Sequence, residues 1–125
     1  MGHMNKTYIP ALLSVILLAW LHSMASAGHW YVRYPGFDIL MHILGGMGLA
    51  FSVYWILRTF FPRYRCSFWH IILVTFIAGA MWEVFEAINN IAGAPVGTPR
   101  YYLDLAKDLV NDTLGAIVAA YFLRK

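Results

Sequence analysis

The chain has 125 residues, of which 61% are hydrophobic and only 12% are Asp, Glu, Lys or Arg. A soluble domain is roughly 45–50% apolar and about 25% charged, so this composition excludes an ordinary soluble protein and predicts an integral membrane protein. The net charge of +3 comes from Lys and Arg scattered at segment ends, which does not indicate nucleic-acid binding. The single cysteine, Cys66, excludes an intrachain disulfide.

Four apolar segments follow one another, each close to the roughly 20 residues that a helix needs to cross the hydrocarbon core. They predict an all-α, polytopic membrane protein in which residues 5–125 form a single bundle of four transmembrane helices. The short connections make sequential neighbours antiparallel. Residues 1–4 read M-G-H-M and are interpreted as an expression scar. The predicted helices cover about residues 8–27, 37–61, 68–91 and 99–123.

The first segment has two interpretations. Lys6, the apolar run of residues 9–21 and the small residues 25–27 resemble a signal peptide followed by its cleavage site. The segment is also long enough to span a membrane. We expect it to be retained as the first helix of the bundle, and its removal as a signal peptide stays open.

The distribution of Lys and Arg predicts the orientation in the membrane. Only Arg33 and Arg100 lie in the two connections on one side. By the positive-inside rule, the opposite side is cytoplasmic, which places both termini and the middle loop inside, in an inner or plasma membrane. The positive residues on that side are Lys6, Arg58, Arg63, Arg65, Arg124 and Lys125.

The acidic residues lie in or at the edge of the apolar segments, and none lies in the predicted cytoplasmic loop. Ionisable groups inside a membrane are costly, so they indicate a functional site. With the predicted orientation, all of them fall in the outer half of the bundle together with His42. The six are Asp38, Glu83, Glu86, Asp104, Asp108 and Asp112.

Helical spacing gives each of the last three segments one polar stripe. Such stripes should meet inside the bundle rather than face lipid. We therefore expect Asp104, Asp108 and Asn111 to face His42 and Glu86, with Asp112 as the deepest acid. The stripes consist of Asp38 and His42, then Glu83, Glu86 and Asn90, then Asp104, Asp108 and Asn111, with Asp112 at the edge.

Glycines on the second and fourth segments predict close helix packing beside these stripes. Gly45, Gly46 and Gly48 lie on the second segment, and Gly115 lies on the fourth. Small residues at helix interfaces let the backbones approach closely. We therefore expect neighbouring helices to approach these two segments closely, with close packing resuming at Gly115, where the polar stripe ends.

Six carboxylates cannot all be ionised in one dry pocket without compensation. Coupled carboxylates can share protons, Lys107, Arg33, Arg100 and the histidines can pair with them, or a divalent metal can bind. Carboxylates with one imidazole suit Mg²⁺, Mn²⁺, Ca²⁺, Fe²⁺ or Zn²⁺, and the identity stays open. The predicted ligands are Asp38, His42, Glu86, Asp104, Asp108 and Asp112; the catalytic candidates are Glu83, Glu86 and Asp108; the supporting residues are Asn111, Lys107, Arg100 and Asn90.

A site in the outer half suits a cell-envelope or lipid-linked substrate. A metal with a neighbouring carboxylate base is a hydrolase or transferase arrangement, which is the leading hypothesis. A proton- or cation-coupled transporter or channel subunit is the first alternative, and we expect it to be a homo-oligomer because four helices form only a small pathway. A structural accessory protein is the second. The expected partners are membrane lipid and the substrate, with no nucleic acid.

Three motifs carry a resemblance to a known family. They are D-x-x-x-H with following glycines from Asp38, W-E-x-x-E from Trp82, and R…D-x-x-x-D-x-x-N-D-x-x-G from Arg100 to Gly115. Over about residues 38–120 the chain resembles the VanZ-like small membrane proteins. It resembles even more closely a related group of bacterial inner-membrane proteins of unknown function. VanZ-like proteins typically have E-x-x-Q at the second motif. That family is linked to low-level resistance to teicoplanin-type glycopeptides, so the resemblance implies a membrane protein with an envelope context.

Overall fold

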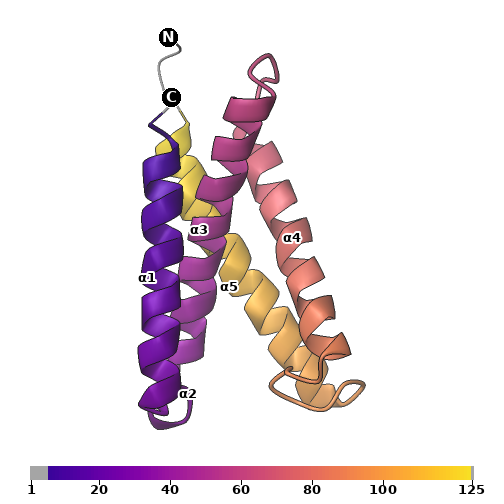
Figure 1. Cartoon of the computed structure of the whole chain (residues 1–125). Helices are drawn as coiled ribbons and strands as arrows, with labels where there is room; N and C mark the ends of the chain where they lie inside the picture. The colour runs from indigo at the N-terminus through magenta and orange to yellow at the C-terminus, as the bar shows by residue number, and fades with distance from the viewer. Residues whose placement is uncertain (1–5, 125) are drawn as a thin grey trace.

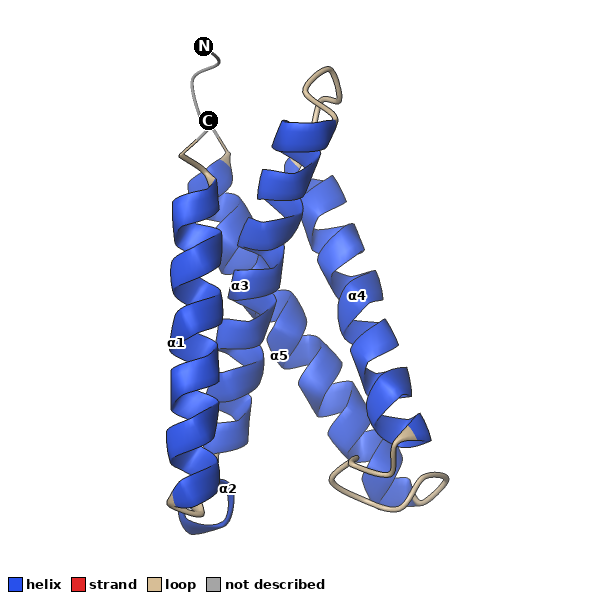
Figure 2. Cartoon of the chain, viewed as in Figure 1, coloured by secondary structure: helices blue, strands red, loops and turns tan. Residues whose placement is uncertain are grey.

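The computed structural model describes residues 6–124, so the expression scar predicted at residues 1–4 lies outside the described residues. Within residues 6–124 the chain is all-α, as predicted, with four long helices and one short helix (Figures 1 and 2). The helices are α1 (Tyr8–Ala27), α2 (Trp30–Arg33), α3 (Phe37–Phe60), α4 (Phe68–Ile88) and α5 (Pro99–Leu123).

Two details differ from the sequence prediction. The short helix α2 lies in what was expected to be an irregular connection, and α4 ends at Ile88 rather than at Ile91. Asn90 adopts a left-handed backbone with φ 56°, and the N–H of Ile91 donates to the carbonyl of Glu86 at 3.0 Å. This is the Schellman arrangement that ends a helix, with Asn in the position that usually holds Gly. The last predicted residues of this segment therefore form its cap.

Side-chain caps set the starts of α4 and α5. Thr98 Oγ1 accepts a hydrogen bond from the N–H of Tyr101 at 3.2 Å, and Pro99 occupies the first turn of α5. Ser67 Oγ accepts the N–H of His70 at 3.3 Å, while His70 Nδ1 accepts the N–H of Ser67 at 3.3 Å. This reciprocal pair is a capping box, so His70 stabilises the start of α4.

The four long helices run up and down with α5 crossing the others (Figure 1). α1 lies beside α3, and α5 packs against both α3 and α4; within residues 6–124, α1 contacts neither α4 nor α5. The start of α1, the α3–α4 loop and the end of α5 lie at one end of the molecule. α2 and the α4–α5 loop lie at the other end, as the short connections predict.

Three of the described helices, α1, α3 and α4, are long and apolar enough to cross a membrane by length and composition. α5 is not among them because Asp104, Lys107, Asp108 and Asp112 interrupt its apolar sequence. The prediction of transmembrane helices is therefore supported for three segments. The fourth segment forms the expected helix of 25 residues, but its composition is more polar.

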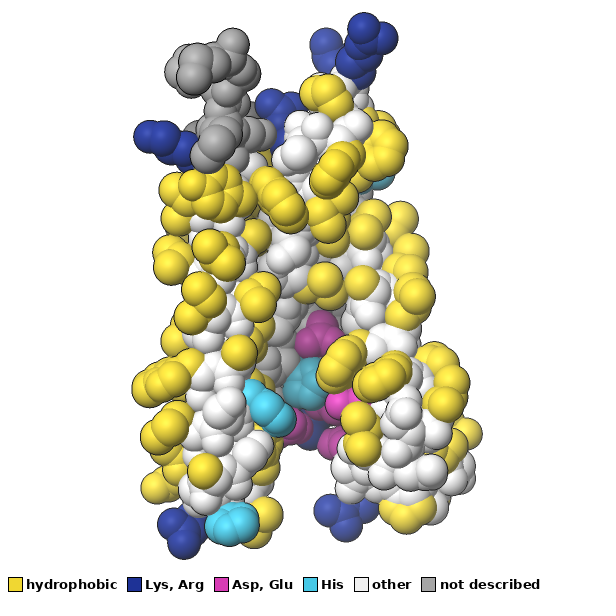
Figure 3. Space-filling view, in the orientation of Figure 1, with side chains coloured by type: hydrophobic (Ala, Val, Ile, Leu, Met, Phe, Trp, Pro, Cys, Tyr) yellow, Lys and Arg dark blue, Asp and Glu magenta, His cyan; other side chains and the backbone are white. Residues whose placement is uncertain are grey.

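Small residues are prominent in the centre of the bundle. Large apolar side chains cover its surface (Figure 3). Ala50, Ala116, Ala119 and Ala120 are fully buried, whereas large side chains such as Trp69 are exposed. Membrane helices pack through small residues because lipid is as apolar as the protein interior. The pattern therefore fits helices that present their large side chains to lipid.

Close helix packing at two of the glycines of α3 and α5 occurs where these helices cross. A Cβ built on Gly46 would overlap the backbone carbonyl of Asp112, and one on Gly115 would overlap the carbonyl of Ile43. Gly48 instead faces α1. Gly45 was expected to contribute to this packing, but no described atom lies within 4 Å of a Cβ built there, because it points away from the crossing.

Candidate metal centre

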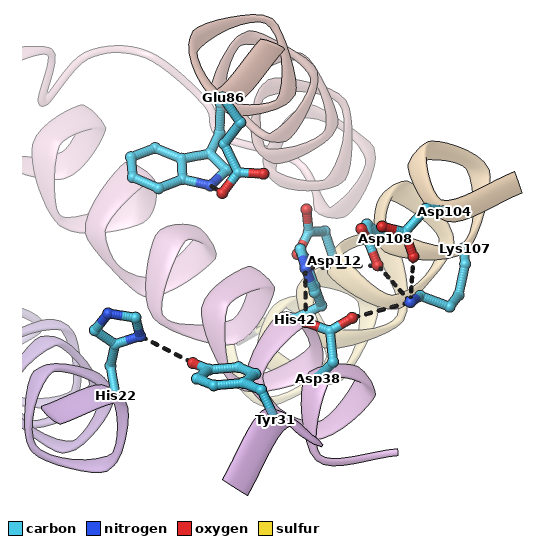
Figure 4. Close-up of polar contacts among 10 residues, drawn as sticks. His22, Tyr31, Asp38, His42, Glu86, Asp104, Lys107, Asp108 and Asp112 are labelled. Atoms are coloured by element: carbon cyan, nitrogen blue, oxygen red, sulfur yellow. Dashed lines mark hydrogen bonds and ion pairs between the residues drawn. The ribbon is translucent and has the colours of Figure 1, made fainter. Parts of the chain in front are cut away.

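His42 lies between two sets of carboxylates. Its Nε2 is 3.7 Å from Oδ1 of Asp38 and 3.5 Å from Oδ1 of Asp108, whereas its Nδ1 forms a 3.1 Å hydrogen bond with Oδ1 of Asp112 (Figure 4). The His42 side chain is only 17% exposed. One imidazole therefore joins an outer group, with Asp38 and Asp108, to an inner group that includes Asp112.

Lys107 compensates the outer group. Its Nζ lies 2.9 Å from Oδ2 of Asp38, 2.7 Å from Oδ1 of Asp104 and 3.4 Å from Oδ1 of Asp108. One ammonium group thus contacts three carboxylates. Pairing with Lys107 was one of the ways in which we expected the acids to be compensated. The Lys107 ammonium group therefore lies between Asp38 and Asp108, in the position that a metal ion bound to both would take.

Among residues 6–124, no lysine or arginine forms an ion pair with the inner group, which consists of His42, Glu83 and Asp112. His42, Glu83 and Asp112 each bring one potential ligand atom within 4.8 Å of the others. Glu83 is only 5% exposed, and its Oε1 has no hydrogen-bond partner among the described residues. An unpaired buried carboxylate is costly unless a proton or a cation compensates it. This group therefore fits a divalent cation better than the outer group does.

The buried face of α4 explains why Glu83 points inward. Thr75, Gly79 and Glu83 lie at successive i, i+4 positions and are all buried. A Cβ on Gly79 would lie 3.0 Å from Oδ2 of Asp112, so the glycine leaves room for that carboxylate. Thr75 and Gly79 were not predicted to lie beside the site, although their i, i+4 spacing with Glu83 is visible in the sequence.

Several predicted site residues lie outside both groups. Glu86 Oε1 accepts a 2.9 Å hydrogen bond from Nε1 of Trp82, and the side chain lies apart from His42 (Figure 4). Asp104 is bound by Lys107 and belongs to neither group, and Asn111 is buried in α5. We expected Glu86 to face His42, but the phase of α4 gives that position to Glu83.

Of the residues predicted to support the site, some contact the acids and others lie outside the cluster. Lys107 contacts the carboxylates, but Asn90 is exposed in the cap of α4. Arg100 and Arg33 are exposed near the end of the bundle, and neither forms an ion pair with any described acid. Solvent screens a guanidinium there, so pairing with the buried acids would contribute little.

The fold and the cluster together define a membrane protein with apolar helices around a buried group of acids and a histidine. A family model described as "Predicted membrane protein (DUF2238)" matches residues 2–125, and the chain belongs to this family. No curated protein and no solved structure matches the chain. The family match supports the predicted membrane location, and it does not connect the chain with the VanZ-like proteins.

Proposed function

We propose that the chain is a four-span membrane protein that binds a divalent metal ion between His42, Glu83 and Asp112. The observation that carries this proposal is the buried Glu83 carboxylate, whose Oε1 lacks a partner among the described residues. An imidazole and two carboxylates are a ligand set for Mg²⁺, Mn²⁺, Ca²⁺, Fe²⁺ or Zn²⁺. Sites with three protein ligands leave coordination positions open, as catalytic sites do.

The proposed chemistry is hydrolysis or group transfer. A metal bound there would act as a Lewis acid towards a carbonyl or phosphoryl oxygen. Asp108 would accept a proton from the attacking water or hydroxyl group, because its buried Oδ1 forms no hydrogen bond among the described residues and has only the longer ion-pair contacts with His42 Nε2 at 3.5 Å and Lys107 Nζ at 3.4 Å. Lys107 would hold Asp38 and Asp104 in place beside it.

The proposed topology makes α5 the fourth span. Its polar first half is covered by α3 and α4, where Asp108, Asn111 and Asp112 are buried, so these residues do not face lipid. Lys and Arg are concentrated at the end that holds the α3–α4 loop, which we assign to the cytoplasm. The metal centre then lies in the outer half of an inner or plasma membrane.

The proposed substrate is a cell-envelope or lipid-linked molecule. α1 and α4 do not contact each other within the described residues, and the surface between them is hollowed with acidic and histidine side chains at its back (Figure 3). A substrate anchored in the outer leaflet would reach the acids sideways through this opening. The resemblance to VanZ-like proteins supports the same envelope context.

Metal binding is tested with detergent-purified protein and a pair of matched variants. We expect Mn²⁺ or Zn²⁺ to raise the thermal unfolding midpoint, and Glu83→Gln to abolish the shift. Glu86→Gln makes the same change one turn away on α4, outside both ligand groups, and should leave the shift intact. An absence of any shift with the five candidate ions, or an equal loss in both variants, would contradict the proposal.

One observation favours proton-coupled transport as a second candidate. The two ring nitrogens of His42 face different carboxylates, Asp108 on one side and Asp112 on the other, which is the geometry of a proton shuttle. A homo-oligomer would give such a carrier a larger pathway. In liposomes, this candidate predicts a pH-driven flux that Asp108→Asn abolishes; a flux unchanged by that substitution would remove it.

A further inference from the structure

A second polar cavity lies at the end of the bundle opposite the acids. It has a volume of about 230 Å³ and lies between the end of α3, the α3–α4 loop and the end of α5. Arg58, Arg65 and Arg124 line it, one from each of these parts of the chain. Segments far apart in the sequence therefore bring three arginine residues to the lining of one cavity.

No acidic side chain of residues 6–124 pairs with any of the three arginines. All six acids lie in the first turn of α3, the last turns of α4 and the part of α5 from Pro99 to Asp112. Within residues 6–124, Arg58, Arg65 and Arg124 form no ion pair, and Arg124 lies 3.7 Å above the ring of Tyr121. Burial raises the pKa of the Cys66 thiol in the same cavity, and the charge of Arg58 opposes this rise. The cavity is thus strongly cationic.

The remaining lining residues are mostly apolar. Ile71 and Ala120 are buried and form part of the wall, and Tyr54 adds a hydroxyl group. Ligand pockets for drug-sized molecules are typically about 300–1,000 Å³, so this cavity suits a single phosphate group rather than a nucleotide. Guanidinium groups bind phosphate oxygens through paired N–H donors, which makes arginine the preferred residue for this ligand.

We propose that this cavity binds a phosphate group, carried either by an anionic lipid headgroup or by free phosphate. The cavity opens where the apolar helices end, at the depth of lipid headgroups if the bundle spans a membrane. Basic pockets between transmembrane helices on the cytoplasmic side bind anionic headgroups in this way. The proposal is independent of the metal centre, because no residue belongs to both sites.

The test measures binding to the purified full chain in a neutral detergent. Dioctanoyl phosphatidic acid should raise the thermal unfolding midpoint, whereas dioctanoyl phosphatidylcholine should not. Inorganic phosphate is compared with chloride at equal ionic strength in a parallel titration. Stabilisation by phosphatidic acid alone identifies a lipid headgroup, and comparable stabilisation by inorganic phosphate identifies free phosphate.

Arg65→Gln and Arg63→Gln form the matched pair of variants. Both remove one positive charge from the same loop, but only Arg65 lines the cavity. We expect Arg65→Gln to weaken binding by roughly tenfold or more, as for loss of a charged hydrogen bond, and Arg63→Gln to have little effect. Arg58→Lys keeps the charge and should retain part of the affinity. Equal weakening by Arg65→Gln and Arg63→Gln, or no stabilisation by either phosphate compound, would overturn the proposal.

Discussion

Replacing Gly46 by alanine should separate α3 from α5, whereas the same change at Gly45 should not. A Cβ on Gly46 would overlap the carbonyl oxygen, carbonyl carbon and Cα of Asp112, and none of these backbone atoms can rotate away. No described atom lies within 4 Å of a Cβ built on Gly45. The two residues are neighbours in the same helix, so the pair isolates the effect of the crossing.

The magnitudes follow from two contributions. Alanine stabilises a helix interior by about 0.5–1 kcal/mol relative to glycine, and this gain applies to both variants. Overpacking costs about 1–3 kcal/mol, and only Gly46→Ala incurs it. The free energies of unfolding of the two variants should therefore differ by about 1–3 kcal/mol. Because the clash involves Asp112 itself, Gly46→Ala should also weaken metal binding at the proposed centre.

The assay is unfolding by dodecyl sulfate in mixed micelles, followed by the fluorescence of the five tryptophans. The free energies of Gly45→Ala, Gly46→Ala and the parent chain are compared at the same lipid and detergent composition. If both variants have the same stability, α3 and α5 do not pack at Gly46, and the geometry derived for the metal centre is refuted.

Three further predictions concern other parts of the chain. Lys107→Gln should lower the free energy of unfolding by about 1–3 kcal/mol, because Asp38 and Asp104 each lose a charged hydrogen bond. The control Arg100→Gln should change this free energy by less than about 0.5 kcal/mol, and equal losses for the two variants in denaturant titrations would contradict the prediction. Asn90→Val should destabilise the protein by about 1–3 kcal/mol, because a β-branched residue is strained at φ 56°, and Asn90→Gly should not. Equal stabilities of the Val and Gly variants in calorimetry would argue against the cap. Cys66 should react in intact cells with N-ethylmaleimide but not with a membrane-impermeant maleimide, and labelling by the impermeant reagent would reverse the proposed orientation. Because burial raises the pKa of the Cys66 thiol, its reaction should become faster as the pH rises and more thiolate forms.

The sequence predicts the starts of α1 and α5 well because a recognisable signal marks each of them. Thr98 and Pro99 begin α5 where expected, and the apolar run beginning at residue 8 matches α1. The end of α4 was misplaced because Asn90 was assigned to a helical polar stripe. Its backbone instead adopts the left-handed conformation of a cap, which hydropathy does not reveal.

The sequence was sufficient to predict which residues belong near the candidate site, but it was not sufficient to predict which side chains contact one another. The spacing of Asp38, His42 and Asp108 is sufficient to place them on facing stripes. The choice between Glu83 and Glu86 depends on the rotation of α4 about its axis, and that rotation is set by packing at Gly79 against Asp112. Pairing of Lys107 with three carboxylates likewise depends on the crossing of α3 and α5, which a one-dimensional pattern does not specify.

Anomalous X-ray scattering from crystals soaked in Mn²⁺ tests the central claim most directly. The proposed function predicts one strong peak within coordination distance of His42, Glu83 and Asp112, and its loss in Glu83→Gln crystals. A peak among Asp38, Asp104 and Asp108 in place of Lys107, or no peak at any carboxylate in crystals soaked with saturating Mn²⁺, would contradict it.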